Sequence, residues 1–413
     1  MIGIIADDVT GGTDAASACR DGGLRTALSF GVPDIDSQVR DVDAHVIALK
    51  TRSVPARDAV AQTLNAAHAL RREGAESFYF KYCSTFDSTA DGNIGPVLDA
   101  LAAMLDAETV VTTPAAPGHG RTVYRGYLFV GDRLLSESHM RDHPLTPMRD
   151  SFVPRLLAAQ TRHPIASLDY GAVRSGEIAL RRLLTGSNVA GTTYFVADAI
   201  DDADLATIAS VIRNEKLTAG SAGLIGAIAR DLATDSGGAA VRRLPTRSAV
   251  VAGSCSAATL AQIDAFKGAG LPWYELDILA TPDPAVLADS ALAWFDRLIP
   301  NEPALIYSSR PAEELSIVQR VLGVARSAEI TERATADIAV GLAERGVKRI
   351  ISAGGETSGA VVDALHLRTG IIGREAAAGV PWIHVDDDIA ILLKSGNFGD
   401  RDLLVRAVTQ ETT

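Results

Sequence analysis

Short apolar runs alternate along the chain with longer stretches in which apolar residues recur every three or four positions. The short runs predict buried strands, and the longer stretches predict amphipathic helices. In the first half the predicted strands are Ile2–Ala6, His45–Leu49, Phe78–Lys81, Val110–Thr112, Pro164–Leu168 and Tyr194–Val196. The predicted helices are Gly12–Asp21, Ala56–Arg72, Ile94–Leu105, Asp202–Ile212 and Leu224–Leu232. Strands that alternate with helices indicate an α/β fold with a mostly parallel sheet.

One stretch of the first half departs from this alternation. Residues Arg121–Leu135 alternate aromatic with small residues, and Gly126 and Gly131 supply turns. Antiparallel strands joined by glycine turns fit this pattern. We therefore expect a hairpin inserted into the first domain.

The strand and helix rhythm resumes near residue 248. Strands are predicted over 249–252, 304–307 and 349–352, with a helix over Ala258–Ala265. Before them lies a segment rich in Gly, Ser and Asp, followed by a basic stretch with a proline, which is typical of a linker. We predict an N-terminal domain over residues 1–235, a linker over 236–247 and a C-terminal domain over 248–413. Each domain is expected to hold a mostly parallel sheet flanked by helices.

Charge and cysteine content narrow the function classes. The 39 Lys and Arg residues against 51 Asp and Glu residues give a formal charge of −12. An acidic chain offers no general surface for nucleic acid or for an anionic membrane, so we expect neither as a partner. The three cysteines are far apart, which is typical of reduced thiols. The chain start lacks the pattern of a secretory signal, and no apolar run is long enough to span a bilayer, so we expect a cytoplasmic protein.

Several common catalytic motifs are missing from the sequence. There is no P-loop, no G-x-G-x-x-G after a predicted strand, no H-E-x-x-H and no G-x-S-x-G. Their absence disfavours a P-loop enzyme, an enzyme with a Rossmann-bound dinucleotide, a zinc protease and a serine hydrolase.

Polar residues follow the predicted strands of the first half. Asp7 and Asp8 come directly after the first strand, and Thr10 follows in a Thr-Gly-Gly turn. Ligands of open α/β sheets bind beyond the carboxyl ends of the strands. A carboxylate there can bind a sugar hydroxyl or act as its general base. The alternative is a helix N-cap cluster without chemistry.

Two further strands of the first half end in similar segments. Lys81 is followed by a hydroxyl-rich segment that includes Ser84 and Asp87, and Arg52 lies just after another predicted strand. Such side chains suit a polyhydroxylated anion, because a lysine can serve as a point charge for a carboxylate. A solvated loop is the alternative for each segment alone.

Glycine-rich turns follow the predicted strands of the second half. They are Gly253–Ser256 and Gly354–Gly355, the second before a helix predicted over Ala360–Leu365, and Lys394–Gly399 is another glycine loop close to the C-terminus. Paired glycines let the backbone approach a phosphate, and a helix N-terminus supplies N–H donors. Glu356 can orient a metal-bound water and Thr357 can hydrogen-bond a phosphate, so the turns indicate a nucleotide site.

These motifs resemble those of the four-carbon acid sugar kinases over essentially the whole chain. Ile5–Gly11 is similar to the N-terminal signature of that family, with Val9 in place of the usual Phe, and Gly354–Thr357 is similar to its nucleotide signature. Gly220–Leu224 also matches a recurrent segment. The branch that phosphorylates 3-oxo-tetronate is indicated by three further segments, which are Phe80–Thr89 with Gly92–Pro96, Gly126–Gly131 and Lys394–Gly399.

The resemblance implies a sugar-acid domain followed by an ATP domain, and transfer of the γ-phosphate of ATP to the 4-hydroxyl of a four-carbon acid. Threonate or erythronate is the alternative to 3-oxo-tetronate as acceptor. It places the nucleotide contacts on Ser254, Ser256, Gly354, Gly355, Glu356, Thr357 and Gly396. It places acceptor contacts on Asp8, Thr10, Arg52, Lys81 and Asp87.

We hypothesise that Lys81, Arg52 or Arg121 binds the acceptor carboxylate, and that Asp8 or Asp87 is the general base, with Mg²⁺ on the phosphates. Asp7 and Ser84 are further candidates for acceptor binding. The metal ligands stay unassigned, and Asp386–Asp388 fits a solvated turn better than a metal site. Two other functions remain open, a sugar-acid sensor without catalysis and an NAD-dependent oxidoreductase. The Arg121–Leu135 hairpin is a candidate arm for a homodimer.

Overall fold

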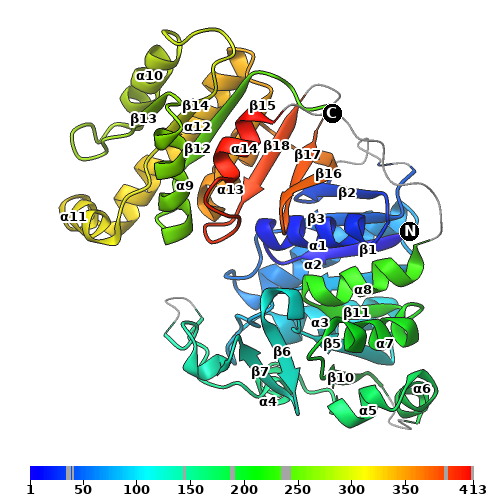
Figure 1. Ribbon diagram of the computed structural model, residues 1–413. Coiled ribbons are helices and arrows are strands. Elements are labelled where there is room, and N and C mark those ends of the chain that lie inside the picture. Colours follow the sequence, from blue (N-terminus) through cyan, green and yellow to red (C-terminus); the bar gives the residue numbers. More distant parts are fainter. Residues whose placement is uncertain are drawn as a thin grey trace. The chain divides into compact units, whose positions relative to one another are not determined.

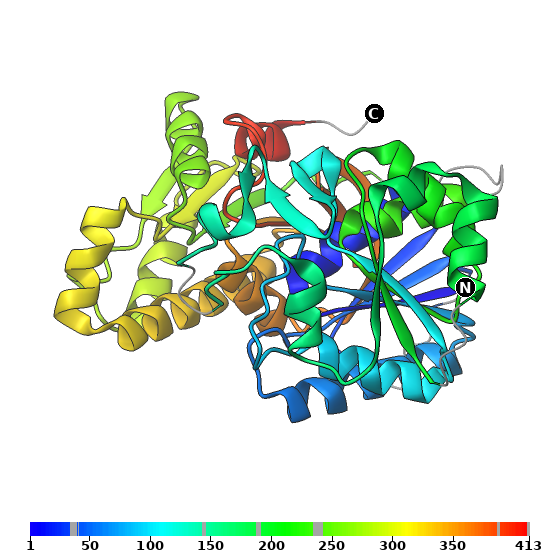
Figure 2. The ribbon, with the colours of Figure 1, turned by 90° about the horizontal axis from the view of Figure 1, so that it is seen from below.

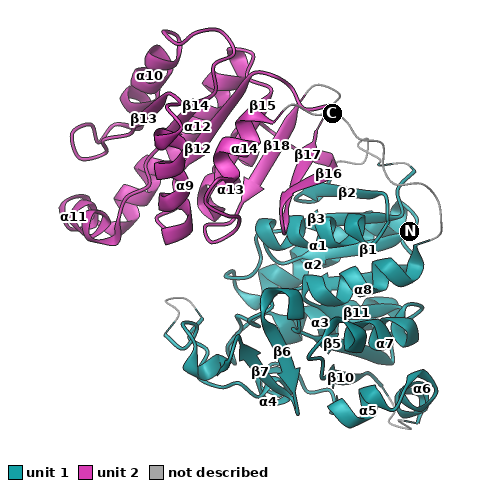
Figure 3. Cartoon of the chain, in the orientation of Figure 1, with its two compact units in different colours: residues 1–238 teal, residues 239–413 magenta. Residues whose placement is uncertain are grey.

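The computed structural model describes residues 1–33, 39, 41–142, 146–186, 191–233, 243–385 and 389–410. The chain divides into two compact units, residues 1–238 and 239–413 (Figure 3). Of the predicted linker, residues 236–242 lie outside the described residues, and 243–247 form neither helix nor strand. Asp386–Asp388 also lies outside them.

The sheet of unit 1 is built from buried, largely apolar strands. In space they run in the order β2-β3-β1-β4-β11-β5-β10-β9, and neighbouring strands are parallel. Side chains on both faces are buried, which suits nearly continuous apolar strands covered by helices on each side. The strands are β1 (Ile2–Ala6), β2 (Thr26–Phe30), β3 (Ala44–Ala48), β4 (Ser77–Lys81), β5 (Thr109–Thr113), β9 (Ile165–Leu168), β10 (Thr193–Ala197) and β11 (Leu217–Gly220).

Helices cover the two faces of this sheet (Figures 1 and 2). On one face α1 (Val9–Asp21), α8 (Ala222–Leu232) and α7 (Asp202–Ile212) pack in a row, and on the other α2 (Ala56–Arg72) packs against α3 (Ile94–Leu105). Helix α7 begins with a capping box, in which the side chains of Asp201 and Asp204 each accept a backbone N–H of the other. The shorter helices are α4 (Val153–Ala158), α5 (Tyr170–Arg174) and α6 (Glu177–Thr185).

The predicted insertion forms a separate antiparallel sheet of β6 (Arg121–Tyr124), β7 (Tyr127–Val130) and β8 (Arg133–Leu134). Asp198, a buried residue just beyond β10, holds it to the rest of the unit. Its carboxylate accepts the backbone N–H groups of Arg125 at 2.6 Å, Gly126 at 2.8 Å and Tyr170 at 2.8 Å. Gly126 adopts φ +77°, the left-handed conformation that a tight hairpin turn requires.

Unit 2 holds a mixed sheet in the order β13-β14-β12-β15-β18-β17-β16. The first five strands in this order are parallel, whereas β17 is antiparallel to both β18 and β16. The strands are β12 (Ser248–Ala252), β13 (Trp273–Glu275), β14 (Ala304–Tyr307), β15 (Arg349–Ala353), β16 (Thr369–Ala377), β17 (Val380–His384) and β18 (Ala390–Lys394).

Two groups of helices pack on this sheet. Helix α9 (Ala257–Gly268) packs against α14 (Leu403–Thr409), and α12 (Val324–Glu344) packs against α10 (Pro284–Phe295), α11 (Ala312–Leu322) and α13 (Gly355–Ala364). Alternate strand residues such as Val250 and Ala252 join Phe266 and Leu404 in one core cluster. The period of two therefore sends one face of the sheet toward α9 and α14.

The predicted α/β class, the mostly parallel sheets and the antiparallel insertion are confirmed. The strands Thr26–Phe30 and Leu217–Gly220 escaped prediction because they mix small or polar residues with apolar ones, and only their parallel neighbours make them strands. Helix α13 begins at Gly355 rather than at Ala360, because Gly354 at φ +133° turns the chain immediately after β15. No described helix is long and apolar enough to cross a membrane.

Candidate functional site

The ends of three neighbouring strands in unit 1 lie level with one another. Parallel pairing sets Ala6 of β1 beside Ala48 of β3 and Lys81 of β4. The backbone N–H of Asp7 donates to the carbonyl of Lys81 at 3.1 Å, and that of Arg52 donates to the carbonyl of Asp7 at 3.1 Å. The residues that follow each strand are therefore gathered at the carboxyl edge of the sheet.

Arg52 is the centre of this group. Its Nε and Nη2 donate to the two carboxylate oxygens of Asp7 at 3.0 and 2.7 Å, and Nη2 also donates to Oδ1 of Asp8 at 2.8 Å. Its Nη1 lies 3.9 Å from Oδ2 of Asp87. One guanidinium thus serves three carboxylates, and we call Asp7, Asp8, Arg52 and Asp87 the Arg52 cluster.

Asp8 is both a helix cap and a member of this cluster. Its Oδ1 accepts the N–H of Gly11 at 2.8 Å and its Oδ2 accepts the hydroxyl of Thr10 at 2.8 Å. Burial alone pushes its pKa upward, but the charges of Arg52 and Lys81 and these hydrogen bonds outweigh burial and lower the pKa. Asp8 is therefore a firmly ionised carboxylate at neutral pH.

Asp7 responds in the opposite direction. Its side chain is more deeply buried than that of Asp8, so burial raises its pKa in spite of the bidentate contact with Arg52. Asp7 accordingly depends on Arg52 to remain charged. In this structure both oxygens of Asp7 accept hydrogen bonds from Arg52, so Asp7 helps to fix Arg52 in place.

Lys81 brings a second cation to this edge of the sheet. Only 2% of the residue is exposed, and its Nζ donates to the carbonyl of Tyr82 at 3.1 Å. The same Nζ lies 3.8 Å from Oδ2 of Asp14 on α1. A Cβ at Gly11 would come within 3.3 Å of Nζ, so the ammonium lies against the first turn of α1.

Asp87 is held by an unusual turn. Phe86 and Asp87 both adopt positive φ, 64° and 43°, which side chains other than glycine rarely do. The hydroxyl of Thr85 donates to Oδ1 of Asp87 at 2.6 Å. Such backbone strain of about 1–3 kcal/mol for each residue persists only where the surroundings impose it, and it is common at functional sites. In this turn Oδ2 of Asp87 lies 3.9 Å from Nη1 of Arg52.

Two predicted acceptor-binding residues are not joined to this cluster. Ser84 is half-buried just after β4, and Arg121 begins β6 in the insertion, where its Nη1 donates to the carbonyl of His119. No hydrogen bond or ion pair in the described part of the chain links Ser84 or Arg121 to the Arg52 cluster. Thr10 does reach the cluster, through Asp8.

In unit 2 the turns after β12, β15 and β18 are tied together. The N–H groups of Gly253 and Ser254 both donate to the carbonyl of Ala353, at 3.0 and 3.1 Å, and that of Gly354 donates to the carbonyl of Lys394 at 2.8 Å. Ser256 Oγ donates to the carbonyl of Gly396 at 2.5 Å. The predicted nucleotide residues are thus brought to one end of this sheet.

The glycines of these turns let the backbone segments approach one another closely. A Cβ at Gly253 would lie 2.4 Å from Oγ1 of Thr357, and one at Gly396 would lie 2.6 Å from Oγ of Ser254. Gly355, in contrast, faces open space. Helices α9 and α13 both begin here, so their free N–H groups and positive ends favour an anion.

Glu356 and Thr357 occupy the first turn of α13. Glu356 is exposed and Thr357 is buried next to Gly253 and Gly354. A carboxylate in the first turn of a helix also stabilises that helix by itself. In the part of the chain that the structure describes, no three His, Cys, Asp or Glu side chains form a group that could hold a metal ion.

Sequence reasoning overlooked Lys394, the last residue of β18. The available signal was a lysine that closes an otherwise apolar strand, the same pattern as Lys81 at the end of β4. Its ammonium donates to the hydroxyl of Thr259 and to the carbonyls of Ser395 and Gly396. Lys394 thus contacts the third glycine turn directly.

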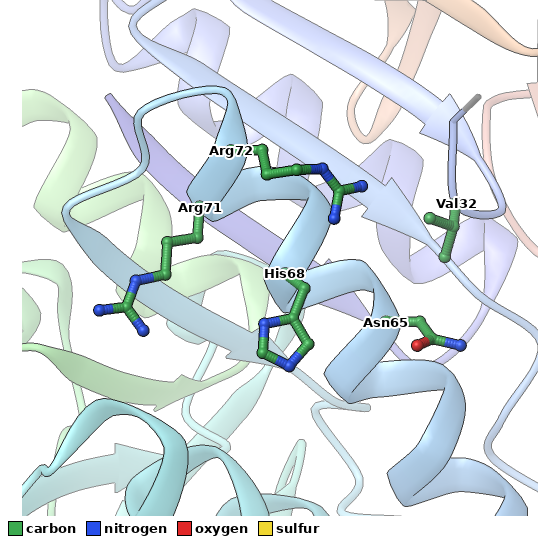
Figure 4. A pocket seen from close by; sticks show the side chains of 5 residues that line it. All are labelled: Val32, Asn65, His68, Arg71 and Arg72. Atoms are coloured by element: carbon green, nitrogen blue, oxygen red, sulfur yellow. The ribbon is translucent and has the colours of Figure 1, made fainter. Parts of the chain in front are cut away.

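A pocket of about 530 Å³ elsewhere in unit 1 contains none of these residues. It is lined by Val32, Asn65, His68, Arg71 and Arg72 (Figure 4). Figure 4 shows that the side chains of Arg71 and Arg72 point in different directions rather than toward one point. The pocket therefore lacks the converging groups that a specific anion site needs.

Two family descriptions together match most of the chain. Residues 2–228 match the sugar-binding N-terminal domain, and residues 249–404 match the nucleotide-binding C-terminal domain. The Arg52 cluster lies in the first of these regions and the glycine turns lie in the second.

Relatives of known name match over nearly the full length. A 3-oxo-tetronate kinase of Cupriavidus necator is 42% identical over 99% of this chain and 97% of its own, and one of Methylobacterium radiotolerans is 43% identical over 98% of each. A Salmonella typhimurium LT2 protein, described provisionally as a tRNA synthase, has the same fold. Its crystal structure matches with a TM-score of 0.92 and 39% identity, over 100% of this chain and 99% of its own.

Proposed function

This chain belongs to the four-carbon acid sugar kinases, which are ATP-dependent, and we propose that it phosphorylates the 4-hydroxyl of 3-oxo-tetronate. The observation that carries the choice of acceptor is the 42–43% identity to kinases of that name over nearly the whole of both chains. Threonate and erythronate, which have the same carboxylate and 4-hydroxyl, are the alternative acceptors.

The acceptor carboxylate is assigned to Lys81 rather than to Arg52. Arg52 already donates to Asp7 and Asp8 and lies near Asp87, so carboxylates of the cluster compensate its charge. The ammonium of Lys81 has three donors, of which one is engaged by the carbonyl of Tyr82, and the carboxylate of Asp14, at 3.8 Å, lies beyond hydrogen-bond distance. A buried ammonium with free donors binds a carboxylate strongly, because charge-assisted hydrogen bonds strengthen away from water.

Asp87 is assigned as the general base in preference to Asp8. The oxygens of Asp8 accept hydrogen bonds from Thr10, Gly11 and Arg52, and its pKa is lowered, so it is a weak proton acceptor. Among the described residues Asp87 has one close donor, Thr85 on Oδ1, and its Oδ2 has the longer contact with Arg52. That oxygen is the one left to accept the proton of an acceptor hydroxyl.

The glycine turns of unit 2 are assigned to the nucleotide. Bound ATP supplies the phosphoryl group, and Mg²⁺, which is commonly held by phosphates and one or two carboxylates, neutralises their charge. The chain contributes backbone N–H groups at the starts of α9 and α13 and the hydroxyls of Ser254 and Thr357. The glycines at 253 and 396 let their turns pack closely against the hydroxyls of Thr357 and Ser254, which keeps these donors at the same end of the sheet.

The first experiment is ATP consumption with Mg²⁺ and each of 3-oxo-tetronate, threonate and erythronate. The proposal expects the highest kcat/KM with 3-oxo-tetronate. A higher value with threonate or erythronate would retain the kinase and overturn the choice of acceptor. Binding of sugar acids without ATP consumption would favour the sensor, and acceptor-dependent reduction of NAD would favour the oxidoreductase.

Two variants test the choice of base. Asp87→Asn is expected to lower turnover by about 10²–10⁴-fold, the usual contribution of a general base, with ATP affinity unchanged. Asp8→Asn is the matched control for charge, because asparagine is an equally good N-cap, and it is expected to lower turnover less. Full turnover in the Asp87 variant, or a larger loss in the Asp8 variant, would contradict this assignment.

We further propose that the insertion mediates a homodimer. Tyr124 and Tyr127 of its sheet are 42% and 41% exposed and together offer two aromatic side chains for contact with a second copy. Sedimentation of the wild type and of a Tyr124→Ser, Tyr127→Ser variant tests this. A wild type that sediments as a monomer would refute it.

A further inference from the structure

Lys394 is a fully buried lysine without an acidic partner in the described residues. Its residue exposure is 0%, and its Nζ donates to Thr259 Oγ1 at 2.8 Å, to the Gly396 carbonyl at 2.9 Å and to the Ser395 carbonyl at 3.1 Å. All three donors of the ammonium are therefore used, and each acceptor is uncharged. A buried charge without a counter-ion is unfavourable by several kcal/mol, so packing alone does not explain a lysine here.

Side chains on one face of helix α9 donate hydrogen bonds to carbonyls of the same turn. Ser256, Thr259 and Gln262 are three residues apart, so they lie along one side of the helix. Ser256 and Thr259 donate to the carbonyl of Gly396 at 2.5 and 3.0 Å. Gln262 Nε2 donates to the carbonyls of Phe398, Gly399 and Asp400 at 3.1, 3.2 and 2.9 Å. We call Lys394, Ser256, Thr259 and Gln262 the carbonyl clamp.

The clamp fixes which way the peptide groups of the turn point. In a planar trans peptide the carbonyl of one residue and the N–H of the next point in opposite directions. The described chain has no cis peptide. Holding the carbonyls of Ser395 and Gly396 therefore turns the N–H groups of Gly396 and Asn397 away from the clamp, and the structure shows no acceptor for either of them in the described residues.

We propose that Lys394 is a positioning residue of the nucleotide site, which holds two carbonyls so that the N–H groups of Gly396 and Asn397 face the phosphates of ATP. The inference rests on the proposed nucleotide site, and it adds a lysine that does not touch the nucleotide itself. Successive N–H groups aimed at one point are a common way to bind a phosphate.

Lys394→Met removes the donors and keeps the length of the side chain. Isothermal titration calorimetry with Mg·ATP and with Mg·ADP measures nucleotide affinity without an acceptor. It therefore tests this inference even if the proposed acceptor is wrong. We expect nucleotide affinity to fall by about 10- to 100-fold, because the N–H groups of Gly396 and Asn397 would no longer be aligned to donate to the charged phosphates. We expect the thermal midpoint to hold or rise, because an unpaired buried charge has been removed.

A second lysine, in the last turn of α9, provides the matched control. Lys267 Nζ donates to the hydroxyl of Tyr307 at 2.7 Å and lies over the ring of Trp273, apart from the clamp. Lys267→Met removes the same charge, and we expect nucleotide affinity within twofold of the wild type. Equal affinities in the wild type and in both methionine variants would show that Lys394 has only a structural role.

The pH dependence of nucleotide binding gives an independent readout. Burial lowers the pKa of Lys394 from 10.5 to about 8. Other titratable groups occur on the elements that pack around β18, but none contributes to this shift. They are Asp264 and Lys267 on α9, Arg349 on β15, Glu356 and Asp363 on α13, and His384 on β17.

The signs of the two pH effects differ. Above about pH 8 the folded protein loses the proton of Lys394 while the unfolded chain keeps it up to about 10.5, so this group makes stability rise with pH in that window. Over the same window a donor of the clamp is lost, and wild-type affinity for Mg·ADP is expected to fall. The Lys394→Met variant should show neither change.

Two outcomes would overturn the inference. One is a wild-type affinity that stays constant from pH 7 to 9.5. The other is a Thr259→Val variant that folds and binds Mg·ADP as the wild type does, since this change removes a clamp partner and keeps Lys394. The Thr259 variant also decides the question if Lys394→Met fails to fold, and we expect it to weaken binding severalfold.

Discussion

Replacing Arg52 by methionine tests whether the Arg52 cluster is held together by one charge. The change removes the bidentate contact with Asp7, the contact with Asp8 and the longer one with Asp87. It leaves three carboxylates at one edge of the sheet with Lys81 as the remaining cation that contributes to their charge balance. Of the three carboxylates, Asp7 loses the most stabilisation of its charge, because its side chain is 8% exposed and its pKa is already raised by burial.

The size of the effect follows from the burial of the pair. Removing one partner of a fully buried ion pair destabilises a protein by about 3–5 kcal/mol. The side chain of Arg52 is 25% exposed, so water reaches part of the site and the expected loss is about 2–3 kcal/mol. For a unit of this size that loss lowers the thermal midpoint by roughly 4–12 °C.

The loss should depend on pH in a defined direction. In the wild type the lowered pKa of Asp8 contributes stability above about pH 4, and this stability is lost as the pH falls through the folded pKa. The raised pKa of Asp7 acts in the opposite sense. Without Arg52 the pKa of Asp8 rises from its lowered value and that of Asp7 rises further. The gap between wild type and variant should therefore be largest at pH 7 and shrink as the carboxylates become protonated.

The assay is thermal and urea unfolding of the wild type, Arg52→Met, Asp7→Asn and the double variant between pH 4 and 8. In the double variant Asp7→Asn should restore at least about 1 kcal/mol, because the buried charge that needed Arg52 is gone. Arg25→Met is the matched control, since Arg25 pairs with Asp43 at 3.2 Å in a half-exposed setting and its loss should leave the midpoint unchanged. A midpoint lowered by less than about 2 °C, or a gap that does not vary with pH, would refute the reasoning.

Two further predictions concern backbone approach and the insertion. Gly396→Ala places a Cβ 2.6 Å from Ser254 Oγ, and it should destabilise unit 2 by about 1–3 kcal/mol and weaken Mg·ADP binding. In Gly355→Ala the new Cβ meets no protein atom, so the melting midpoint should stay unchanged. Weaker Mg·ADP binding by Gly355→Ala would therefore report contact between residue 355 and the nucleotide. Equal midpoints for the two variants would argue against the close packing. Asp198→Ala leaves the N–H groups of Arg125, Gly126 and Tyr170 without their acceptor. We expect the free energy of unfolding, measured in urea, to fall by about 2–4 kcal/mol. We also expect faster proteolysis within residues 121–134. Wild-type resistance to proteolysis would show that the insertion is held by other contacts.

The elements predicted most accurately are those whose sequence carries its own signal. Helices Ala56–Arg72, Ile94–Leu105 and Asp202–Ile212 form with the predicted bounds. Apolar residues at helical spacing, and for Asp202–Ile212 a capping box, specify such segments locally. The strand Leu217–Gly220 carries no such signal, because its place between β4 and β5 depends on residues more than a hundred positions away.

Some features of the candidate site are likewise predictable from the sequence, and others depend on the folded structure. The sequence shows that Asp7, Asp8 and Arg52 follow strands and that Lys81 ends one, and parallel strands bring their carboxyl ends to one edge. The different states of Asp7 and Asp8 were not readable, because they depend on burial and on which oxygens Arg52 reaches. Nor was the positive φ of Phe86 and Asp87 readable, since no glycine marks that turn.

Local sequence patterns are enough to predict the α/β class, the antiparallel insertion, and the strand ends and glycine turns that carry polar chemistry. Those features rest on local spacing and on residue types with one strong conformational preference. Only the folded chain shows that Asp8 caps a helix, that Oδ2 of Asp87 has no closer contact than Arg52 at 3.9 Å among the described residues, and that Lys394 holds the Gly396 turn. These properties depend on distances between residues far apart in the chain and on exclusion of water, and both arise only when the sheets have formed.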